Sequence, residues 1–283
     1  MTPTERRDKL RDLEIDAART QRLTCKFRTY FPDTGPLRRE LYPRSLEFFA
    51  GGGVRNADGS YRYRERGFMG ANRTSKTVTA AFEVTTHLTG AYPAWWPGRK
   101  FESPTRWWAA GDSRETTRDI IQLELFGPRE DVRLDRYTGM VPGHLVGDRA
   151  LKQGMTDCLD LVWIKHRERE HGAPCFSTLQ FKSYDQGRKS FQGTTLTGGV
   201  WLDEEPPDVT EDTAGGGTPS GNGDIYTECL LRTATTEGMI IATFVPLRGL
   251  TPFIDSYLET ADMIDADGRI VNAKMGMFGE AEL

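Results

Sequence analysis

The chain has 283 residues, 37% of them hydrophobic and 28% charged, and carries a formal net charge of −4. This size allows one large α/β domain or two small ones, and the composition is typical of a soluble globular protein. No apolar run approaches the roughly 20 residues of a membrane span, and the N-terminus lacks the apolar core of a signal peptide. The four cysteines form no C-x-x-C pair, so neither a zinc site nor a disulfide framework is indicated. These features make the cytoplasm the default location.

Charge is distributed unevenly along the chain. Basic residues outnumber acidic ones over residues 1–66, whereas acidic residues predominate from Glu205 onward. A polyanion would be attracted chiefly to the first segment and repelled by the last. A solvated surface with uneven charge explains the same pattern equally well.

The chain begins with a predicted amphipathic helix over residues 3–23, which we expect to pack on the main body. Its first residues include a proline and a glutamate at positions typical of a helix start. An aromatic segment with prolines follows. Within it, residues 42–49 are a candidate for the wall of an adenine site, with the Tyr42 ring stacked on the base. Plain core packing of the same aromatic residues is the alternative and the commoner role.

The segment from Gly70 to Thr77, GANRTSKT, matches the phosphate-binding loop pattern G-x-x-x-x-G-K-[ST] except at one position. A tight loop that enters a helix directs several backbone N–H groups at one point, and the helix N-terminus adds partial positive charge. Lys76 can then reach the β- and γ-phosphates of a nucleotide, and the Thr77 hydroxyl can ligate Mg²⁺. Ser75 replaces the second glycine, and its Cβ implies a backbone conformation that does not need a positive φ. The predicted nucleotide-binding residues are Gly70, Ala71, Asn72, Arg73, Thr74, Ser75, Lys76, Thr77 and Tyr42.

The surroundings of the loop support this interpretation. Residues 66–69 are apolar enough for the end of a buried strand, and residues 76–88 are predicted to form a helix closed by Gly90. A second strand over residues 105–110 leads into a second helix over residues 113–125. Repeated strand-to-helix units predict a parallel sheet with helices on its faces.

The middle of the chain is less regular. Residues 128–155 are expected to be irregular, and strands are predicted over residues 159–164 and 177–181. The charged turn between these strands contains His166 and His171. A solvated turn is the favoured interpretation of the two histidines, and a metal site is the weaker one.

An acidic cluster follows a predicted strand that ends at residues 200–202. The strand delivers Asp203 and Glu204 at its carboxyl end, where ligands bind in parallel sheets. Asp203 suits the holding of Mg²⁺, and Glu204 suits the activation of the attacking water, with Glu205 as a spare carboxylate. Taken alone, the segment also fits a strand that ends in a solvated turn. Together with the phosphate loop, each motif supports the other.

The C-terminal third contains a predicted mobile lid over residues 211–224 and a helix over residues 225–234. A buried strand over residues 238–249 then carries Thr243 near its end. A hydroxyl beside the γ-phosphate could sense hydrolysis and transmit movement. A strand-ending threonine without such a role is the alternative.

With these segments in place, the chain resembles the N-terminal ATPase domain of the tailed-bacteriophage terminase large subunit, the motor that packages DNA into capsids. The resemblance covers residues 40–255, and the run from Ser183 to Pro207 is its most specific part. Its motifs are residues 42–49, G-A-N-R-T-S-K-T, W-W-A-A-G-D-S-R-E-T-T-R-D, residues 182–194, V-W-L-D-E-E-P-P and A-T-F-V-P-L-R-G.

The resemblance implies an α/β fold of the P-loop NTPase class with the ASCE arrangement. This means a mostly parallel central sheet flanked by helices, with an N-terminal helical and aromatic extension and a small C-terminal lid-like segment. The implied activity is Mg²⁺-dependent ATP hydrolysis that powers translocation of double-stranded viral DNA into a procapsid. The implied catalytic residues are Glu204, Arg73 and Lys76, with Thr77 and Asp203 as metal ligands and Thr243 in the motif that couples hydrolysis to translocation.

The resemblance also implies partners and a location. The partners are double-stranded viral DNA, the portal protein and the terminase small subunit, with a homo-oligomeric ring on the portal and no membrane. An arginine from a neighbouring subunit can complete the site in such a ring. The implied location is the host cytoplasm, with transient attachment to the procapsid.

Three segments are expected along the chain. Residues 1–50 hold the N-terminal helix and the adenine-side segment, residues 51–250 the ATPase core, and residues 251–283 a tail. Full-length terminases continue into a nuclease domain whose clustered acids bind two metal ions. The acids near the end of this chain are predicted to lie in a polar tail, so we expect ATPase activity without nuclease activity. These acids are Asp262, Asp265, Asp267, Glu280 and Glu282.

Two other functions stay open on the sequence. One is a helicase-like DNA translocase of the same ATPase class, which would unwind strands without a capsid or a portal. The other is a nucleotide-binding assembly module that has lost hydrolysis, which Ser75 makes conceivable.

Overall fold

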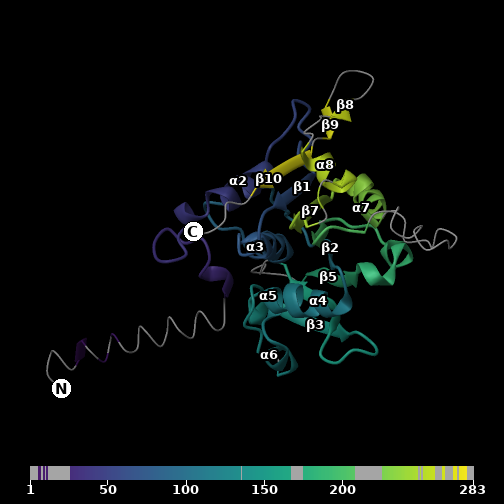
Figure 1. Ribbon diagram of the computed structural model, residues 1–283. Helices are drawn as coiled ribbons and strands as arrows, with labels where there is room; N and C mark the ends of the chain where they lie inside the picture. Colours follow the sequence, from purple (N-terminus) through teal and green to yellow (C-terminus); the bar gives the residue numbers. More distant parts are fainter. Residues whose placement is uncertain are drawn as a thin grey trace.

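A sheet of eight strands organises the chain, as the computed structural model shows (Figure 1). The structure describes residues 26–134, 136–166, 175–207, 225–247, 249 and 251–258, the strand residues 263–264, 270–272 and 274–278, and residues 6, 7, 9 and 11. The strand order is β10-β1-β7-β6-β2-β5-β4-β3, and a separate pair is formed by β8 and β9. The strands are β1 (Glu65–Met69), β2 (Arg106–Gly111), β3 (Val146–Leu151), β4 (Leu159–Lys165), β5 (Phe176–Ser183), β6 (Gly199–Asp203), β7 (Met239–Phe244), β8 (Met263–Ile264), β9 (Ile270–Asn272) and β10 (Lys274–Phe278).

Most neighbouring strands of the large sheet are parallel. From β10 to β5 every pairing is parallel, whereas β4 pairs antiparallel with both β5 and β3. The strand that enters the loop (β1) and the strand that ends in the acids (β6) both pair with β7, which lies between them. This insertion of one strand between the two motifs is the arrangement expected for the ASCE class, and the predicted fold class is confirmed.

Helices cover both faces of the sheet, which explains why its central strands are apolar on both sides. On one face the core includes Trp107 and Ala109 of β2 with residues of α2 and α3, and on the other it includes Trp108 and Ala110 with residues of α7 and α8. In Figure 1 the α4–α6 region and β3 lie at one end of the sheet, and α8 and β10 lie at the other. Among the elements described from end to end, the helices of four or more residues are α2 (Pro43–Gly51), α3 (Lys76–Thr89), the π-helix η3 (Thr117–Gln122), α5 (Leu123–Phe126), α6 (Arg129–Arg133), the 3-10 helix η6 (Arg188–Phe191), α7 (Ile225–Thr233) and α8 (Pro252–Leu258). The three-residue helical turns are η1 (Lys26–Arg28), η2 (Arg39–Leu41), α4 (Arg114–Thr116), η4 (Gly143–Leu145), η5 (Tyr184–Gln186) and η8 (Ala234–Thr236).

The two predicted strand-to-helix units are confirmed. After β1 the helix α3 runs to Gly90, whose left-handed backbone (φ 67°) ends it while its N–H donates to Thr86 O. After β2, Ser113 begins a continuous helical segment of α4, η3 and α5, and its side chain accepts from the Thr116 N–H. Gly127 ends this segment with φ 93°.

Two predictions about irregular segments are wrong. The segment 128–155 contains α6 and β3, because the short and partly polar β3 takes its hydrogen bonds from its neighbour β4. The segment after residue 250 is not only a polar tail, because β10 pairs with the edge of β1 and α8 packs beside it. Gly276 permits this packing, since a Cβ there would lie 2.3 Å from Tyr257 O.

His166 is another correction. The ring is 1% exposed rather than part of a solvated turn, and its Nδ1 lies 3.0 Å from Leu88 O at the end of α3. The reason is that β4 extends to Lys165 and brings the next residue against the helix. His171 lies outside the described residues.

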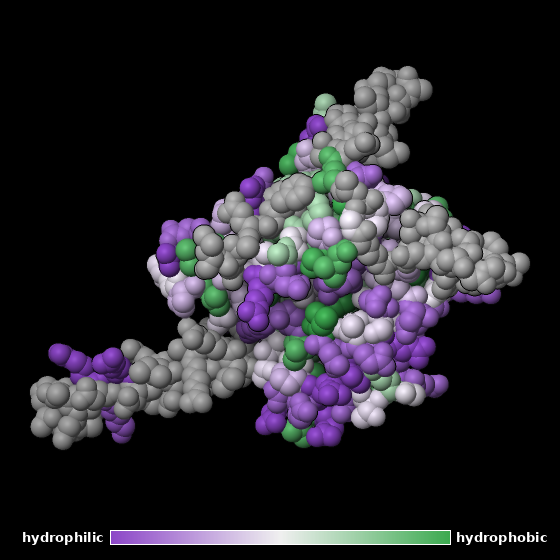
Figure 2. Space-filling model, viewed as in Figure 1, coloured by the Kyte–Doolittle hydropathy of each residue, from purple (hydrophilic) through white to green (hydrophobic). Residues whose placement is uncertain are grey.

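Several predictions fall on other residues that the structure does not describe. They are the lid over residues 211–224, the acids Asp262, Asp265, Asp267, Glu280 and Glu282, and all but four residues of the helix over residues 3–23. In the part of the chain that is described, no helix combines the length and the apolar character needed to cross a membrane. Hydrophilic residues predominate among the coloured atoms of the face in Figure 2, with hydrophobic residues in small groups.

Candidate functional site

The predicted phosphate loop joins the end of β1 to the first turn of α3. The Gly70 N–H donates to Phe244 O at 3.3 Å, so the start of the loop is tied to the end of β7. Arg73 (φ 66°) and Ser75 (φ 57°) both have a left-handed backbone. The expectation that Ser75 avoids a positive φ is therefore wrong. The loop keeps the geometry that a glycine would adopt, at a cost of about 1–2 kcal/mol for a residue with a Cβ.

Lys76 is the first residue of α3 and lies over the loop that precedes it. Its Nζ donates to Gly70 O at 2.9 Å and to Ala71 O at 2.7 Å, and the residue is 8% exposed. Burial lowers the pKa of Lys76, and the nearby carboxylates of Glu204 and Asp203 oppose this effect. The ammonium group therefore lies within electrostatic reach of both predicted acids.

Asp203 is the last residue of β6 and is 6% exposed. Its Oδ1 accepts from the Thr243 hydroxyl at 2.7 Å, and that hydroxyl itself accepts from Trp201 Nε1 at 2.8 Å. Burial raises the pKa of Asp203 to about 6; Glu204 also raises it, whereas Lys76 and the two threonine hydroxyls of Thr243 and Thr77 lower it. The carboxylate is thus held in place by hydroxyl donors in a poorly solvated position.

Glu204 follows β6 with a strained backbone, φ 70°, which is uncommon for a residue with a side chain. Its N–H donates to Thr243 O at 2.7 Å, and its Oε2 accepts from the Val245 N–H at 3.3 Å. The end of β7 therefore contacts both the backbone and the carboxylate of Glu204. The spare carboxylate, Glu205, is buried and accepts a hydrogen bond from the Thr251 hydroxyl.

The two motifs meet through a hydrogen bond between the Thr77 and Asp203 side chains. A hydroxyl and a carboxylate are oxygen donors of the kind that Mg²⁺ prefers, and Mg²⁺ usually keeps several waters besides one or two carboxylates. Among the described residues no group of three or more His, Cys, Asp or Glu could hold a metal. A Thr77–Asp203 pair therefore fits Mg²⁺ completed by water and phosphate oxygens rather than a protein-caged metal.

The other predicted loop residues lie around this pair. Ala71, Asn72 and Arg73 are exposed at the turn of the loop, whereas Thr74 is buried and its hydroxyl donates to Ala71 O at 2.9 Å. An exposed guanidinium at Arg73 suits contact with a bound phosphate.

Tyr42 lies directly before α2 and is half-buried. Its ring meets Phe31 edge-on, with the ring centroids 5.3 Å apart. Helix α2 contacts α3 through the hydroxyls of Ser45 and Thr79, 2.7 Å apart. Core packing accounts for these contacts, and a role of Tyr42 beside a base stays a prediction.

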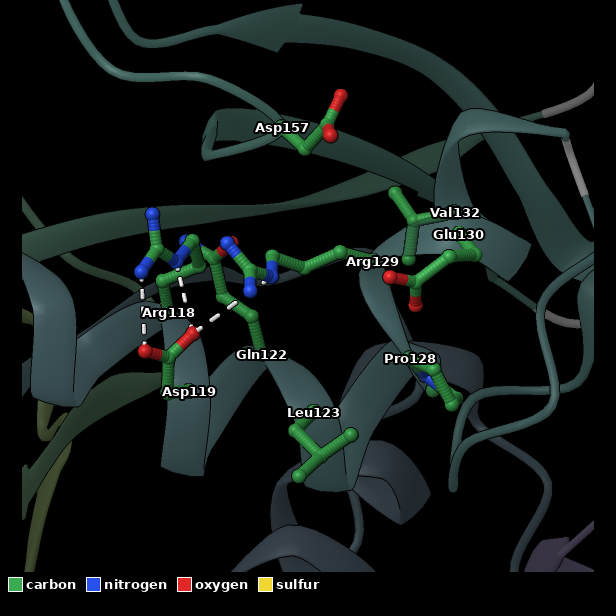
Figure 3. Close-up of a pocket in the computed structure, with 10 residues that line it drawn as sticks. Arg118, Asp119, Gln122, Leu123, Pro128, Arg129, Glu130, Val132 and Asp157 are labelled. Atoms are coloured by element: carbon green, nitrogen blue, oxygen red, sulfur yellow. Dashed lines mark hydrogen bonds and ion pairs between the residues drawn. The ribbon is translucent and has the colours of Figure 1, made fainter.

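A pocket with a volume of about 280 Å³ lies elsewhere, along η3, α5 and α6 (Figure 3). Its polar lining is largely self-paired: Arg118 donates to Asp119 at 2.7 Å, and Arg129 lies 4.0 Å from the same carboxylate. None of its lining residues belongs to the loop or to the acidic cluster. The candidate site is therefore the loop and the acids, because the Lys76, Thr77, Asp203 and Glu204 side chains converge there.

Two features near the site were missed by the sequence analysis. Tyr184 of η5 donates its hydroxyl to Glu204 O at 2.9 Å. Arg66 of β1 and Glu83 of α3 form a fully buried ion pair, with Nη2–Oε1 at 2.5 Å, that joins the strand and the helix on either side of the loop. The only sequence signal for the pair is a charge inside an apolar strand and another inside an apolar helix.

The comparisons with known proteins give one sequence relative. The chain is 31% identical over 214 residues to the terminase large subunit of Salmonella phage P22. The aligned region covers 71% of this chain and 40% of that protein. No protein-family model matches the chain.

The solved structures that the chain is similar to include phage large terminases. The large terminase ATPase domain of Thermus phage P74-26 is 13% identical, with a TM-score of 0.45 over 82% of this chain and 83% of that one. The large terminase of another thermophilic bacteriophage, in complex with ADP, is also 13% identical, with a TM-score of 0.41 over 77% of this chain and 40% of that one.

Proposed function

Because this chain is a relative of phage terminase large subunits over the 214 residues that align, we propose that it hydrolyses ATP as the ATPase part of a DNA-packaging motor. The chain spans about 40% of the length of the relative it matches. The observation that carries the proposal is the convergence of the loop and the acids. The Thr77 and Asp203 side chains share a hydrogen bond, and Lys76 lies within electrostatic reach of Asp203 and Glu204.

In the proposed site the triphosphate lies against the backbone N–H groups of the loop, at the N-terminus of α3. Lys76 leaves the carbonyls of Gly70 and Ala71 and contacts the β- and γ-phosphates, and Arg73 approaches from the exposed side of the loop. Mg²⁺ held by Thr77 and Asp203 would neutralise charge on the phosphate oxygens. These residues lower the barrier by positioning the phosphates and stabilising negative charge.

Glu204 is the proposed catalytic carboxylate. It orients the attacking water and accepts its proton, a contribution of roughly 10²–10⁴-fold in rate for a general base. The Val245 N–H donates to one oxygen of the Glu204 carboxylate, Oε2, and the other oxygen can bind the water. Thr243, which contacts Asp203 and Glu204 at once, is the proposed coupling residue.

The proposed partners are those that the resemblance to terminase large subunits implies: double-stranded viral DNA, the portal protein and the terminase small subunit, in a ring assembled on the portal. The proposed location is the host cytoplasm, with transient attachment to the procapsid. An arginine from a neighbouring subunit would complete the site, so turnover by an isolated chain is expected to be slow.

The test is Mg²⁺-dependent ATP turnover and nucleotide binding in the wild type and in Glu204→Gln. The variant should lose at least roughly 100-fold in turnover while it still binds nucleotide, because it keeps the shape of the side chain and loses the base. Glu130→Gln, at an exposed position on α6 away from the loop and the acids, is the matched control and should turn over like the wild type. Equal turnover in the wild type and Glu204→Gln would remove Glu204 from the mechanism.

A second candidate, a nucleotide-binding module without hydrolysis, is favoured by one observation. Lys76 contacts the carbonyls of its own loop, and Ser75 strains that loop. Nucleotide binding that Lys76→Ala abolishes, with no turnover in the presence of DNA and portal, would identify such a module. Strand displacement by the isolated chain would instead identify a helicase-like translocase.

A further inference from the structure

The strained backbone of Glu204 is held from two sides. From the β7 side, Thr243 O accepts its N–H and the Val245 N–H donates to its carboxylate. From the other side, the Tyr184 hydroxyl donates to Glu204 O at 2.9 Å and lies 3.5 Å from Asp203 O. A left-handed residue with a side chain persists only where its surroundings determine it, and such residues cluster at functional sites.

Tyr184 is itself anchored well enough to impose a position. It is 2% exposed, and its ring packs in the core with Phe191 and residues of β6 and α7. Its turn begins at Ser183, where Ser183 and Gln186 form reciprocal capping hydrogen bonds. Burial raises the pKa of Tyr184 well above its usual value, so the hydroxyl keeps its proton and stays a donor.

The helix η6, which follows this turn, is also braced against α7. Arg188 Nη2 lies 2.8 Å from Glu228 Oε1, and Gln192 Nε2 donates to the same oxygen at 3.3 Å. The Glu228 carboxylate in this contact is buried, whereas the Arg188 side chain is 41% exposed. The position of the Tyr184 hydroxyl is therefore set by ring packing and by the capping hydrogen bonds of its turn, which do not involve the acidic cluster.

We propose that Tyr184 is a positioning residue for Glu204. Its hydroxyl fixes the peptide between Glu204 and Glu205, and with it the left-handed backbone that directs the Glu204 carboxylate to the Val245 amide beside the loop. Without the hydroxyl, a sheltered carbonyl loses its donor, and the peptide rotates to find another partner or to relieve the positive φ. The carboxylate then moves away from the position in which it can orient a water.

This inference rests on the proposed role of Glu204 in ATP hydrolysis, and it adds a residue that acts through the backbone of Glu204. A misplacement of a reacting group by about 1 Å can cost roughly 100-fold in rate, and the loss of one hydrogen bond shifts a local equilibrium by roughly tenfold. We therefore expect an effect on kcat of about tenfold or more, without an effect on nucleotide binding.

The variant that tests the proposal is Tyr184→Phe, which keeps the ring and removes only the hydroxyl. The kcat for ATP should fall about tenfold, while the KM, the nucleotide affinity and the melting temperature stay close to the wild-type values. Tyr257→Phe is the matched control, because Tyr257 is 1% exposed in the same core and its hydroxyl contacts Tyr226 instead of the acidic cluster. It should leave kcat unchanged.

The double variant Tyr184→Phe, Glu204→Gln separates positioning from a general structural effect. If Tyr184 acts through Glu204, the double variant turns over no more slowly than Glu204→Gln alone. A wild-type kcat in Tyr184→Phe, with Glu204→Gln still impaired, would overturn this proposal and leave the proposed function intact. If the wild type itself lacks turnover, the crystal structure of Tyr184→Phe decides. A Glu204 that keeps its φ near 70° and its contact to Val245 would overturn the proposal.

Discussion

Asp203 should destabilise the metal-free protein at neutral pH, and Asp203→Asn should therefore stabilise it. The carboxylate is 6% exposed at the end of β6, and burial is the main reason that its pKa is raised to about 6. The Asn variant keeps the shape of the side chain and removes the charge. A proposed metal ligand is thus expected to lower stability when the metal is absent.

The magnitude follows from the difference between the pKa values of the folded and unfolded chain. A rise in the pKa of Asp203 from 3.8 to about 6 corresponds to a loss of about 3 kcal/mol in the free energy of unfolding when the group is charged. Between these pH values the folded protein still binds the proton that the unfolded chain has released, so stability falls as the pH rises from about 4 to about 6 and stays lower above that. The carboxylate accepts hydrogen bonds from the Thr243 and Thr77 hydroxyls, whereas the Asn side chain accepts one of them. The lost hydrogen bond removes about 1 kcal/mol of the expected gain in stability. We expect a net stabilisation of about 2 kcal/mol at pH 8 and no gain at pH 4.

The assay is thermal unfolding in EDTA at a series of pH values. A gain of about 2 kcal/mol raises the melting temperature by roughly 4–8 °C for a chain of this size. Asp148→Asn, at an exposed position on β3, is the control and should show no such pH-dependent gain. A variant no more stable than the wild type at pH 8, or one stabilised equally at both ends of the pH range, would refute the reasoning. With Mg²⁺ and ATP added, the order should reverse, because only the wild type gains stability from the bound metal.

Two further predictions concern the elements around the loop. Ser75→Gly should raise the free energy of unfolding by about 0.5–1 kcal/mol, because it relieves a left-handed φ of 57° and loses part of this gain to the greater freedom of glycine in the unfolded chain. Urea unfolding measures the change. The control is Ser103→Gly, at an exposed position of ordinary φ, which should be destabilised instead. Glu83→Gln should cost about 3–5 kcal/mol because it leaves the buried charge of Arg66 without its partner. The double variant Arg66→Met, Glu83→Leu should recover much of the lost stability in the same urea experiment. If the double variant lost as much stability as Glu83→Gln, packing rather than charge would explain the cost.

The sequence predicts those parts of the fold and site whose signals are local. The loop, the acids after β6 and Thr243 near the end of β7 each follow an apolar run, and a parallel sheet brings the carboxyl ends of its strands to one edge. Ser75 shows where a local rule fails. A serine does not exclude a left-handed backbone, because the loop contacts on both sides outweigh a cost of about 1–2 kcal/mol.

The remaining features depend on partners that are distant in sequence. Strand β10 is as long as β1, but its sequence KMGMF lacks the β-branched residues typical of a strand. It is defined by its pairing with β1, which lies some two hundred residues earlier. Glu83 in a helix is ordinary until Arg66 is known to face it. Tyr184 has no pattern of its own, since its role follows from where a hydroxyl meets the carbonyl of a residue 20 positions later. Such contacts become visible only when the chain is folded.

The position of Thr243 argues for an indirect coupling role. Its hydroxyl is buried and already bonded to Trp201 Nε1 and Asp203 Oδ1, so it reaches a phosphate only through Asp203. Its carbonyl holds the Glu204 N–H, and the loop is tied to the next residue of β7 through the Gly70 N–H. A shift of β7 would thus move Asp203 (the proposed metal ligand), Glu204 (the proposed catalytic acid) and the start of the loop together. For this reason we expect the strand as a whole, rather than the threonine hydroxyl alone, to carry movement away from the site when the γ-phosphate is lost.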